Sequence, residues 1–144
     1  MKILLLNGPN LNLLGRRKAD IYGGESFEDI LESLRLDFPA AEILYFQSNH
    51  EGGLIDRLHQ SLNESLDGLV INAGALTHYS YALRDALEIL SIPKVEVHIS
   101  HIFSREAFRH TSVISPVCHG MISGMGRDGY RLALLWLQKR VGDG

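Results

Sequence analysis

The sequence KILLLNGPNLNLLGRRKADIYGG, residues 2–24, joins an uninterrupted apolar run to an unusually long loop. Such a run is typical of a strand buried on both faces of a parallel sheet, so we expect a strand over Lys2–Asn7. The next helical pattern begins only near Ser26. Connections from strand to helix usually need about 2–6 residues, and longer ones are typically lids or binding loops. We therefore expect this loop to be functional.

The loop also carries reactive groups. Arg16 and Arg17 lie within six residues of Tyr22. A cation close to a phenol makes the phenol a stronger acid. This arrangement makes the loop the first place to look for chemistry.

The alternation of strand and helix patterns continues along the chain. Further strands are expected at 42–48, 68–72, 94–99 and 112–117, and helices near 26–38, 54–62, 79–90, 105–109 and 129–141. Ser26, with Asp29 three residues on, resembles a helix capping box, and Pro116 makes the last predicted strand an edge candidate. Five strand–helix units predict an α/β fold, a flavodoxin-like doubly wound five-stranded parallel sheet with helices on both faces. A single catalytic domain, residues 1–144, fits this length.

Composition excludes several classes of protein. The net charge of −3 does not suggest a nucleic-acid surface. The single Cys118 rules out an internal disulfide and suits a reducing compartment. The apolar run at the start ends at Asn7, which is too short for a signal peptide, and no run approaches the ~18–20 residues of a membrane span. We expect a cytoplasmic protein that binds neither nucleic acid nor membrane.

Polar side chains follow every predicted strand, at the end where ligands bind in parallel sheets. They are Asn7 and Asn10; Ser48, Asn49 and His50; Asn72, Thr77 and His78; His98, Ser100 and His101; and Cys118 and His119. Capping of the following helices explains Asn49 and Thr77. Capping does not explain the imidazoles, so we expect a ligand site at this edge of the sheet.

Two pairs of residues near the fourth predicted strand are candidates for that site. Glu96 and His98 are two apart, so they point to the same face, where a carboxylate favours the protonated imidazole. An ordinary alternating strand face explains this pair equally well. Arg105 and Arg109 would share one side of a short helix and suit a carboxylate-bearing ligand, unless Glu106 neutralises one of them.

The sequence GMGRDG, residues 124–129, matches a dinucleotide-binding fingerprint. It follows the last strand instead of the first, and no acidic ribose partner can lie ~20 residues further on. Its glycines are better explained by tight turns and close helix packing.

Metal and imine chemistry are not favoured either. A zinc site would need a recognised ligand spacing and a second cysteine, and the histidines near Cys118 offer neither. None of the four lysines is placed as a desolvated nucleophile. Lys94, for example, begins a strand at the wrong end of the sheet.

Several motifs together resemble the type II 3-dehydroquinate dehydratases over nearly the whole chain. In order, they are NGPNLNLLGRR (7–17) followed by Tyr22 and Gly23, QSNHEG (47–52), NAGALTH (72–78), EVHIS (96–100), REAFR (105–109) and SGMGRDGYRLAL (123–134). Independent motifs in one order are far more specific than any one of them. The family's fold is flavodoxin-like, in agreement with the fold predicted above.

The resemblance implies anti elimination of water from 3-dehydroquinate, giving 3-dehydroshikimate through an enolate, without metal or other cofactor. It implies that Tyr22 is the base that removes a proton from carbon 2, with Arg17 as its activator. His98 would be the acid that protonates the departing hydroxyl, with Glu96 orienting it. The substrate would be bound by Asn72, His78, Asp85, Ile99, Ser100 and Arg109, with Asn10 and Arg105 in support.

The resemblance further implies a homo-oligomer, a dodecamer built from trimers, in which Asp85 reaches a neighbouring site. Two departures from the family pattern, Ala19 in the loop and His101 with Ser104 after the fourth strand, affect no catalytic role. A biosynthetic and a catabolic pathway role both stay open. The rival interpretation is a flavodoxin-like binding or signalling module, although the first loop is poor in the hydroxyls of a flavin-phosphate site.

Overall fold

The computed structural model describes residues 1–16 and 24–142. Five parallel strands form one sheet in the order β2-β1-β3-β4-β5. The strands are β1 (Lys2–Asn7), β2 (Glu42–Gln47), β3 (Gly68–Asn72), β4 (Lys94–His98) and β5 (Gly120–Ser123). The prediction of a doubly wound, flavodoxin-like α/β fold is confirmed.

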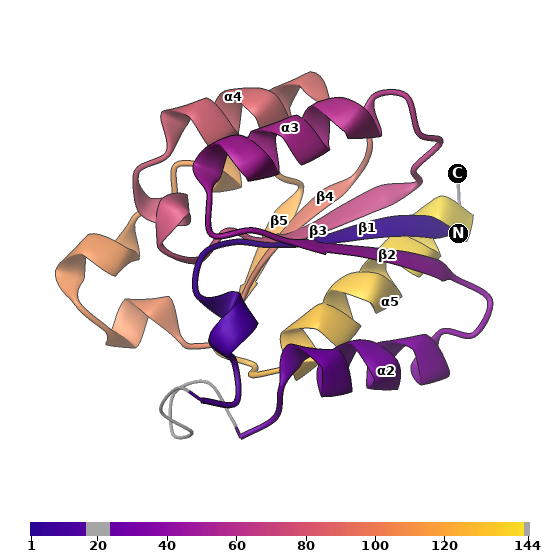
Figure 1. Ribbon diagram of the computed structural model, residues 1–144, viewed down its shortest axis with the longest axis horizontal. Helices are drawn as coiled ribbons and strands as arrows, with labels where there is room; N and C mark the ends of the chain where they lie inside the picture. Colours follow the sequence, from indigo (N-terminus) through magenta and orange to yellow (C-terminus); the bar gives the residue numbers. More distant parts are fainter. Residues whose placement is uncertain (17–23, 143–144) are drawn as a thin grey trace.

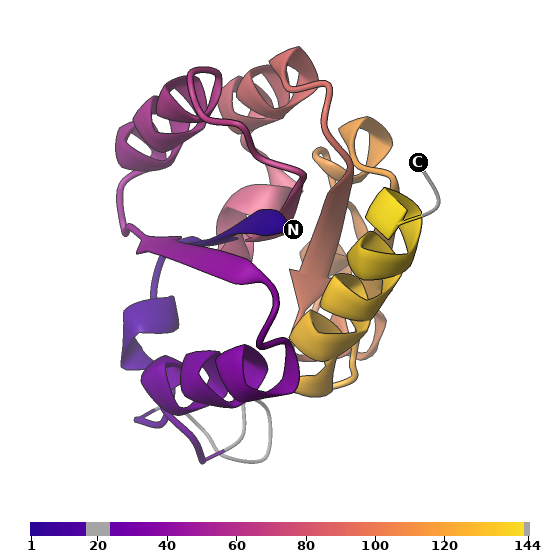
Figure 2. The same cartoon turned by 90° about the vertical axis from the view of Figure 1, so that its right-hand side faces the viewer.

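Helices cover both faces of the sheet. α2 (Phe27–Asp37) and α5 (Asp128–Gly142) lie on one face, and α3 (Glu51–Ser61) and α4 (Tyr81–Ile89) on the other (Figures 1 and 2). Over residues 1–16 and 24–142, five short 3-10 helices occupy the connections: η1 (Leu11–Leu13), η2 (Gly74–His78), η3 (Ile102–Ser104), η4 (Ala107–His110) and η5 (Ser115–Val117). Within the ranges described, no helix combines the length and the apolar character needed to span a membrane.

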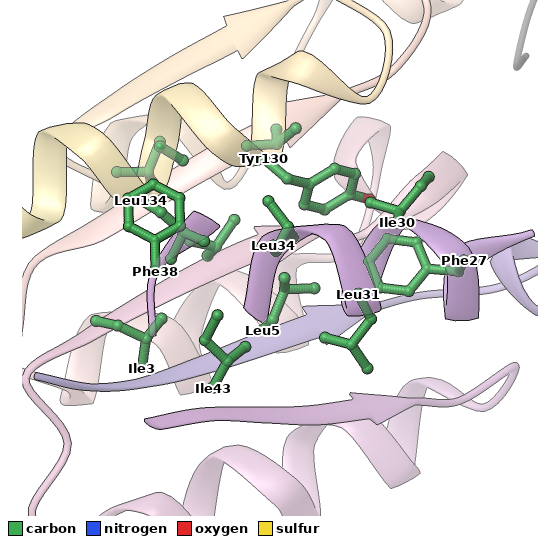
Figure 3. Packing of buried hydrophobic residues seen from close by; sticks show 14 of the residues in the cluster. Ile3, Leu5, Phe27, Ile30, Leu31, Leu34, Phe38, Ile43, Tyr130 and Leu134 are labelled. Carbon is green, nitrogen blue, oxygen red and sulfur yellow. The ribbon is translucent and has the colours of Figure 1, made fainter. Parts of the chain in front are cut away.

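The apolar run of β1 supplies both halves of the core. Successive strand residues point to opposite faces, so Ile3 and Leu5 join the cluster under α2 and α5, while Leu4 and Leu6 join the cluster under α3 and α4. All four side chains are fully buried. Figure 3 shows the first cluster packed between the sheet and its two helices. The uninterrupted run is thus explained by a central strand with no solvent face.

Local signals place the helix starts and turns as expected. Ser26 caps α2, because its Oγ accepts a hydrogen bond from the Asp29 amide at 3.3 Å. Gly124 and Gly126 adopt positive φ of 89° and 59°, and a Cβ on Gly129 would lie 3.0 Å from the Val97 side chain. The interpretation of residues 124–129 as turns and close packing is confirmed.

The predicted fifth strand at 112–117 is wrong. Residues 115–117 form η5 instead, because Pro116 has no amide hydrogen for a strand ladder and the Ser112 hydroxyl accepts from the Ser115 amide at 3.0 Å. The Val113 amide donates to the Thr77 carbonyl at 2.8 Å, which ties the segment to η2. The strand that pairs with β4 at this edge of the sheet is instead the shorter β5 (Gly120–Ser123).

The short helix predicted near 105–109 is present in part, as the 3-10 helix η4 (Ala107–His110). η3 ends at Ser104, Arg105 and Glu106 follow it, and η4 begins at Ala107. The α-helical spacing argument for Arg105 and Arg109 therefore does not hold, although both side chains reach the same pocket.

Candidate active site

One pocket opens at the carboxyl ends of β1, β3 and β4. These strand ends lie on the side of the molecule away from the N-terminus (Figure 1). Eight residues predicted for the site line it: Asn10, Asn72, His78, His98, Ile99, Ser100, Arg105 and Arg109. Gly74, Ala75, Pro9, Leu11 and Ile102 complete the lining. The pocket therefore lies at the edge of the sheet where ligands bind in parallel sheets.

The loops after β1 and β3 form one wall by close backbone approach. The Gly8 amide donates to the Asn72 carbonyl at 2.7 Å, and a Cβ on Gly8 would lie only 2.5 Å from the Ala73 carbonyl oxygen. Asn10 follows in the left-handed region, at φ 72°, and its amide donates to Asn49 Oδ1 at 2.9 Å. Only glycine fits at position 8, so this wall depends on the local sequence NGPN.

Glu96 and His98 form a buried pair at the floor of the pocket. His98 Nε2 lies 2.5 Å from Glu96 Oε2, and Glu96 is completely buried. The Thr77 hydroxyl donates to Oε2 at 2.7 Å, and the Ser112 hydroxyl lies 2.9 Å from both carboxylate oxygens. This carboxylate orients the imidazole through a hydrogen bond, so the pair is more than an alternating strand face.

The hydrogen bonds to Glu96 decide its ionisation. Burial alone would raise the pKa of its carboxyl group, but the hydrogen bond and charge of His98 and the hydroxyls of Thr77 and Ser112 outweigh burial and hold the pKa below its ordinary value. Glu96 is therefore ionised at neutral pH, and it accepts hydrogen bonds from all three neighbours. Since a carboxylate only accepts, the Nε2 of His98 carries the hydrogen in this bond.

His78 is a neutral hydrogen-bonding group of the pocket wall. Its Nδ1 donates to the Thr111 carbonyl at 2.7 Å, and its ring lies nearly parallel to that of His98, with centroids 6.4 Å apart. Burial lowers the pKa of His78, as do the charges of His98 and Arg109, against the opposing effects of the Thr111 carbonyl and Glu96. The Nε2 of neutral His78 is left to accept a hydrogen bond from a ligand hydroxyl.

Two arginines, Arg105 and Arg109, form a further part of the pocket wall. Arg105 Nη1 donates to Ser100 Oγ at 3.1 Å, and Arg109 Nε lies 2.5 Å from Glu106 Oε2. Glu106 thus neutralises one arginine, as the sequence alternative allowed. Together with the neutral amide of Asn72, this wall suits an anionic ligand that also carries hydroxyls.

The family model described as dehydroquinase class II matches residues 1–138. The chain belongs to this family. It is 55% identical to the 3-dehydroquinate dehydratase of Thermotoga maritima, over 98% of this chain and 97% of that protein. It is 52% identical to the 3-dehydroquinate dehydratase of Caldicellulosiruptor saccharolyticus, over 98% and 99%.

A solved structure gives the same answer for the fold. The type II dehydroquinase from Butyrivibrio crossotus is 50% identical in sequence and superposes with a TM-score of 0.93, covering 96% of this chain and 97% of that one. The resemblance noted in the sequence is confirmed, and family membership favours an enzyme over a binding or signalling module.

Of the described residues predicted to bind the substrate, one does not line the pocket. Asp85 is exposed on α4 and does not line the pocket. Arg17 and Tyr22 lie outside the described residues. The described parts that flank them are close together, since a Cβ on Gly15 would lie 3.3 Å from the backbone of Glu25.

The described residues contain no group of three or more His, Cys, Asp or Glu that could hold a metal ion. Burial raises the pKa of the Cys118 thiol to about 12, so this cysteine is not a nucleophile at neutral pH. Lys94 is buried at the start of β4, where its Nζ donates to the Leu90 carbonyl. As expected, it lies at the end of the sheet remote from the pocket.

Three residues that support the pocket by hydrogen bonds were not predicted from the sequence. Thr77, explained as a helix cap, donates to Glu96 instead. Ser112, placed in a strand, supports the same carboxylate. Tyr130 is fully buried in α5, and its hydroxyl bridges Asn72 and Asn7. No local pattern identifies these roles, because each partner is distant in the sequence.

Proposed function

We propose that this chain is a type II 3-dehydroquinate dehydratase, a hydro-lyase that converts 3-dehydroquinate to 3-dehydroshikimate by anti elimination through an enolate. The observation that supports this most strongly is the buried Glu96–His98 pair in a pocket lined by arginines, within a chain that matches the dehydroquinase class II family over residues 1–138. No metal or other cofactor is needed for this reaction, because a base, an acid and hydrogen-bond donors suffice.

His98 acts as the general acid in this mechanism. Glu96 holds its Nε2 at 2.5 Å, so the ring is fixed in orientation and its other nitrogen, Nδ1, is left for the substrate. The Nδ1 of the same ring then gives its proton to the departing hydroxyl. Positioned proton transfer of this kind contributes about 10²–10⁴ in rate.

Tyr22 acts as the base, activated by Arg17. A free tyrosine has a pKa of about 10, so only about 0.1% is ionised at pH 7. Lowering that pKa by ~2–3 requires roughly 3–4 kcal/mol. A cation at ~4 Å, with an effective dielectric constant of ~20, supplies about 4 kcal/mol. One well-placed arginine is therefore sufficient.

The remaining residues bind the substrate. Its carboxylate lies against Asn72 and the backbone amides of Ile99 and Ser100, and its hydroxyls meet His78 and Arg109. Asn10 holds a water near the developing enolate, where a preorganised donor is most effective. Arg105 belongs to the segment that closes over the pocket.

Assembly completes the proposed site. The outer face of α4 exposes Tyr81 and Ile89, at 67% and 60%, on the same helix as Asp85. The family resemblance implies a homo-oligomer, a dodecamer of trimers, in which Asp85 on this helix reaches a neighbouring subunit's site. We place the enzyme in the cytoplasm, as a single catalytic domain serving the shikimate pathway of aromatic amino acid biosynthesis, with quinate degradation as the alternative role.

A turnover assay tests the proposal. Purified protein mixed with 3-dehydroquinate should produce the ultraviolet absorbance of a conjugated product. His98→Asn should lower kcat by about 10²–10⁴, whereas His59→Asn, on the exposed side of α3, should leave kcat unchanged. No absorbance change with the wild-type protein would refute the proposed reaction, and equal kcat in both variants would refute the role of His98.

A further inference from the structure

A chain of buried hydrogen bonds links α5 to the pocket through the sheet. Asn72 Nδ2 lies 2.8 Å from the Tyr130 hydroxyl oxygen, and that hydroxyl lies 2.9 Å from Asn7 Oδ1. Asn7 Nδ2 reaches the Tyr45 hydroxyl more weakly, at 3.4 Å. Tyr130 and Asn7 are fully buried and Asn72 is 3% exposed, so solvent does not replace these partners.

A backbone amide fixes the direction of the whole chain. The Gly74 N–H can only donate, and it donates to Asn72 Oδ1 at 3.1 Å. The other end of the Asn72 amide, Nδ2, must therefore be the donor toward Tyr130. Since the Tyr130 oxygen accepts this bond, its own hydrogen is directed to Asn7 Oδ1. At each of these contacts, one group is therefore fixed as the donor and the other as the acceptor. If the side-chain amide of Asn72 or Asn7 rotated by half a turn, two donors or two acceptors would face each other.

This direction determines what the pocket presents to an anion. The Nδ2 group of Asn72 carries two hydrogens, and Tyr130 accepts one of them. The second is available on the side where Asn72 lines the pocket. If the amide turned over, its carbonyl oxygen would face a bound carboxylate and repel it. Burial raises the pKa of Tyr130 well above its ordinary value, so the hydroxyl stays protonated and keeps the direction at any working pH.

We propose that Tyr130 is a positioning residue for carboxylate recognition: it holds Nδ2 of the Asn72 amide, whose Oδ1 is held by the Gly74 N–H, so that the second N–H is directed toward the substrate; this rests on the proposed function. Asn7 acts one step further back, by accepting the hydrogen of Tyr130. Neither residue touches the substrate. The effect falls on ground-state binding of the carboxylate, so it changes KM more than kcat.

Tyr130→Phe is the direct test, because it removes one hydroxyl and keeps the ring. That ring is held by an edge contact with Phe27, with centroids 5.1 Å apart (Figure 3), so the packing is retained. Tyr45→Phe is the matched control. It removes a hydroxyl from the far end of the same chain, where Asn7 still accepts from Tyr130 and the Asn72 amide is unaffected.

The measurements are KM and kcat for 3-dehydroquinate, and inhibition constants for 3-dehydroshikimate and its uncharged methyl ester. Tyr130→Phe should raise KM and the inhibition constant of the carboxylate ligand about three- to tenfold. This matches the net value of one hydrogen bond, about 0.7–1.4 kcal/mol. It should change kcat and the inhibition constant of the ester less than about twofold. Tyr45→Phe should match the wild-type protein throughout.

If Tyr130→Phe does not fold, Asn7→Leu carries the same test, because it removes the acceptor that directs the Tyr130 hydroxyl. Unchanged affinity for the carboxylate ligand would overturn the proposal. Equal weakening of acid and ester would also overturn it, since a merely structural role does not discriminate between them. Absence of turnover in the wild-type protein refutes the proposed function instead, so the two failures are distinguishable.

Discussion

Thr77→Val is the substitution that most directly tests how hydrogen bonding stabilises the Glu96 carboxylate. Thr77 is completely buried, and its hydroxyl donates to Glu96 Oε2 at 2.7 Å. Valine keeps the shape of the side chain and removes the donor. Ser112 and His98 still contact the carboxylate in the variant, so the loss is partial.

The magnitude follows from the charge of Glu96. A hydrogen bond to a charged group contributes roughly 1.5–3 kcal/mol to stability, and the remaining partners favour the lower end of that range. We expect Thr77→Val to lower the free energy of unfolding by about 1.5 kcal/mol at pH 7. For a domain of this size, that corresponds to a melting temperature lower by about 3–6 °C.

The loss should depend on pH in a defined direction. The folded-state pKa of Glu96 lies below its ordinary value. The ionised carboxylate therefore contributes stability that is present above the unfolded pKa of about 4.3 and is lost as the pH falls through the folded pKa. Thr77→Val removes part of this contribution, so its deficit should be full near pH 7 and should shrink below about pH 4.

Urea unfolding at pH 7 and at pH 3.5, at one fixed protein concentration, measures the effect. Thr77→Ser is the control, since it loses a buried methyl group but keeps the hydroxyl and hence the wild-type pH dependence. A Thr77→Val deficit that is the same at both pH values would refute the reasoning, because the hydroxyl would then not act on the ionised carboxylate.

Three further predictions concern the loop, the chemistry and the pocket wall. Tyr22→Phe should lower kcat by about 10²–10⁴ with KM nearly unchanged in steady-state assays, and near-normal turnover would remove Tyr22 from its role. Neither a chelator nor borohydride with substrate should inactivate the enzyme; covalent trapping, or activity restored by added metal, would contradict this. Gly8→Ala should destabilise the protein by about 1–3 kcal/mol in urea unfolding, because its Cβ would lie 2.5 Å from the Ala73 carbonyl oxygen. Gly52→Ala, with open space in α3, should not destabilise it, and equal effects would refute the packing argument.

The sequence predicts the sheet well where burial is complete. β1 and β3 consist of apolar runs that are buried along nearly their whole length, and their bounds match the expected ones. β5 was missed because it has four residues, begins with glycine and is only partly buried. The segment 112–117 has the composition of a strand, but Pro116 and the Ser112 hydroxyl determine its local turn.

The residues of the candidate site also differ in whether the sequence predicts them. Residues at strand ends, such as Asn72 and His98, could be placed from the rule for parallel sheets, since the topology brings those ends together. The supporting residues could not. The Thr77 hydroxyl bonds a carboxylate 19 positions away, and the Tyr130 hydroxyl reaches an asparagine 123 positions away. Such contacts depend on the complete fold, and local periodicity does not contain them.

A crystal structure of the enzyme with a non-reacting analogue of 3-dehydroquinate is the sharpest test of the proposed mechanism. We expect the analogue's carboxylate against Asn72 Nδ2. We expect the Tyr22 oxygen beside carbon 2 on one face of the ring, and His98 beside the departing hydroxyl on the other face, as anti elimination requires. An analogue bound outside this pocket, or Tyr22 and His98 on the same face of its ring, would refute this mechanism.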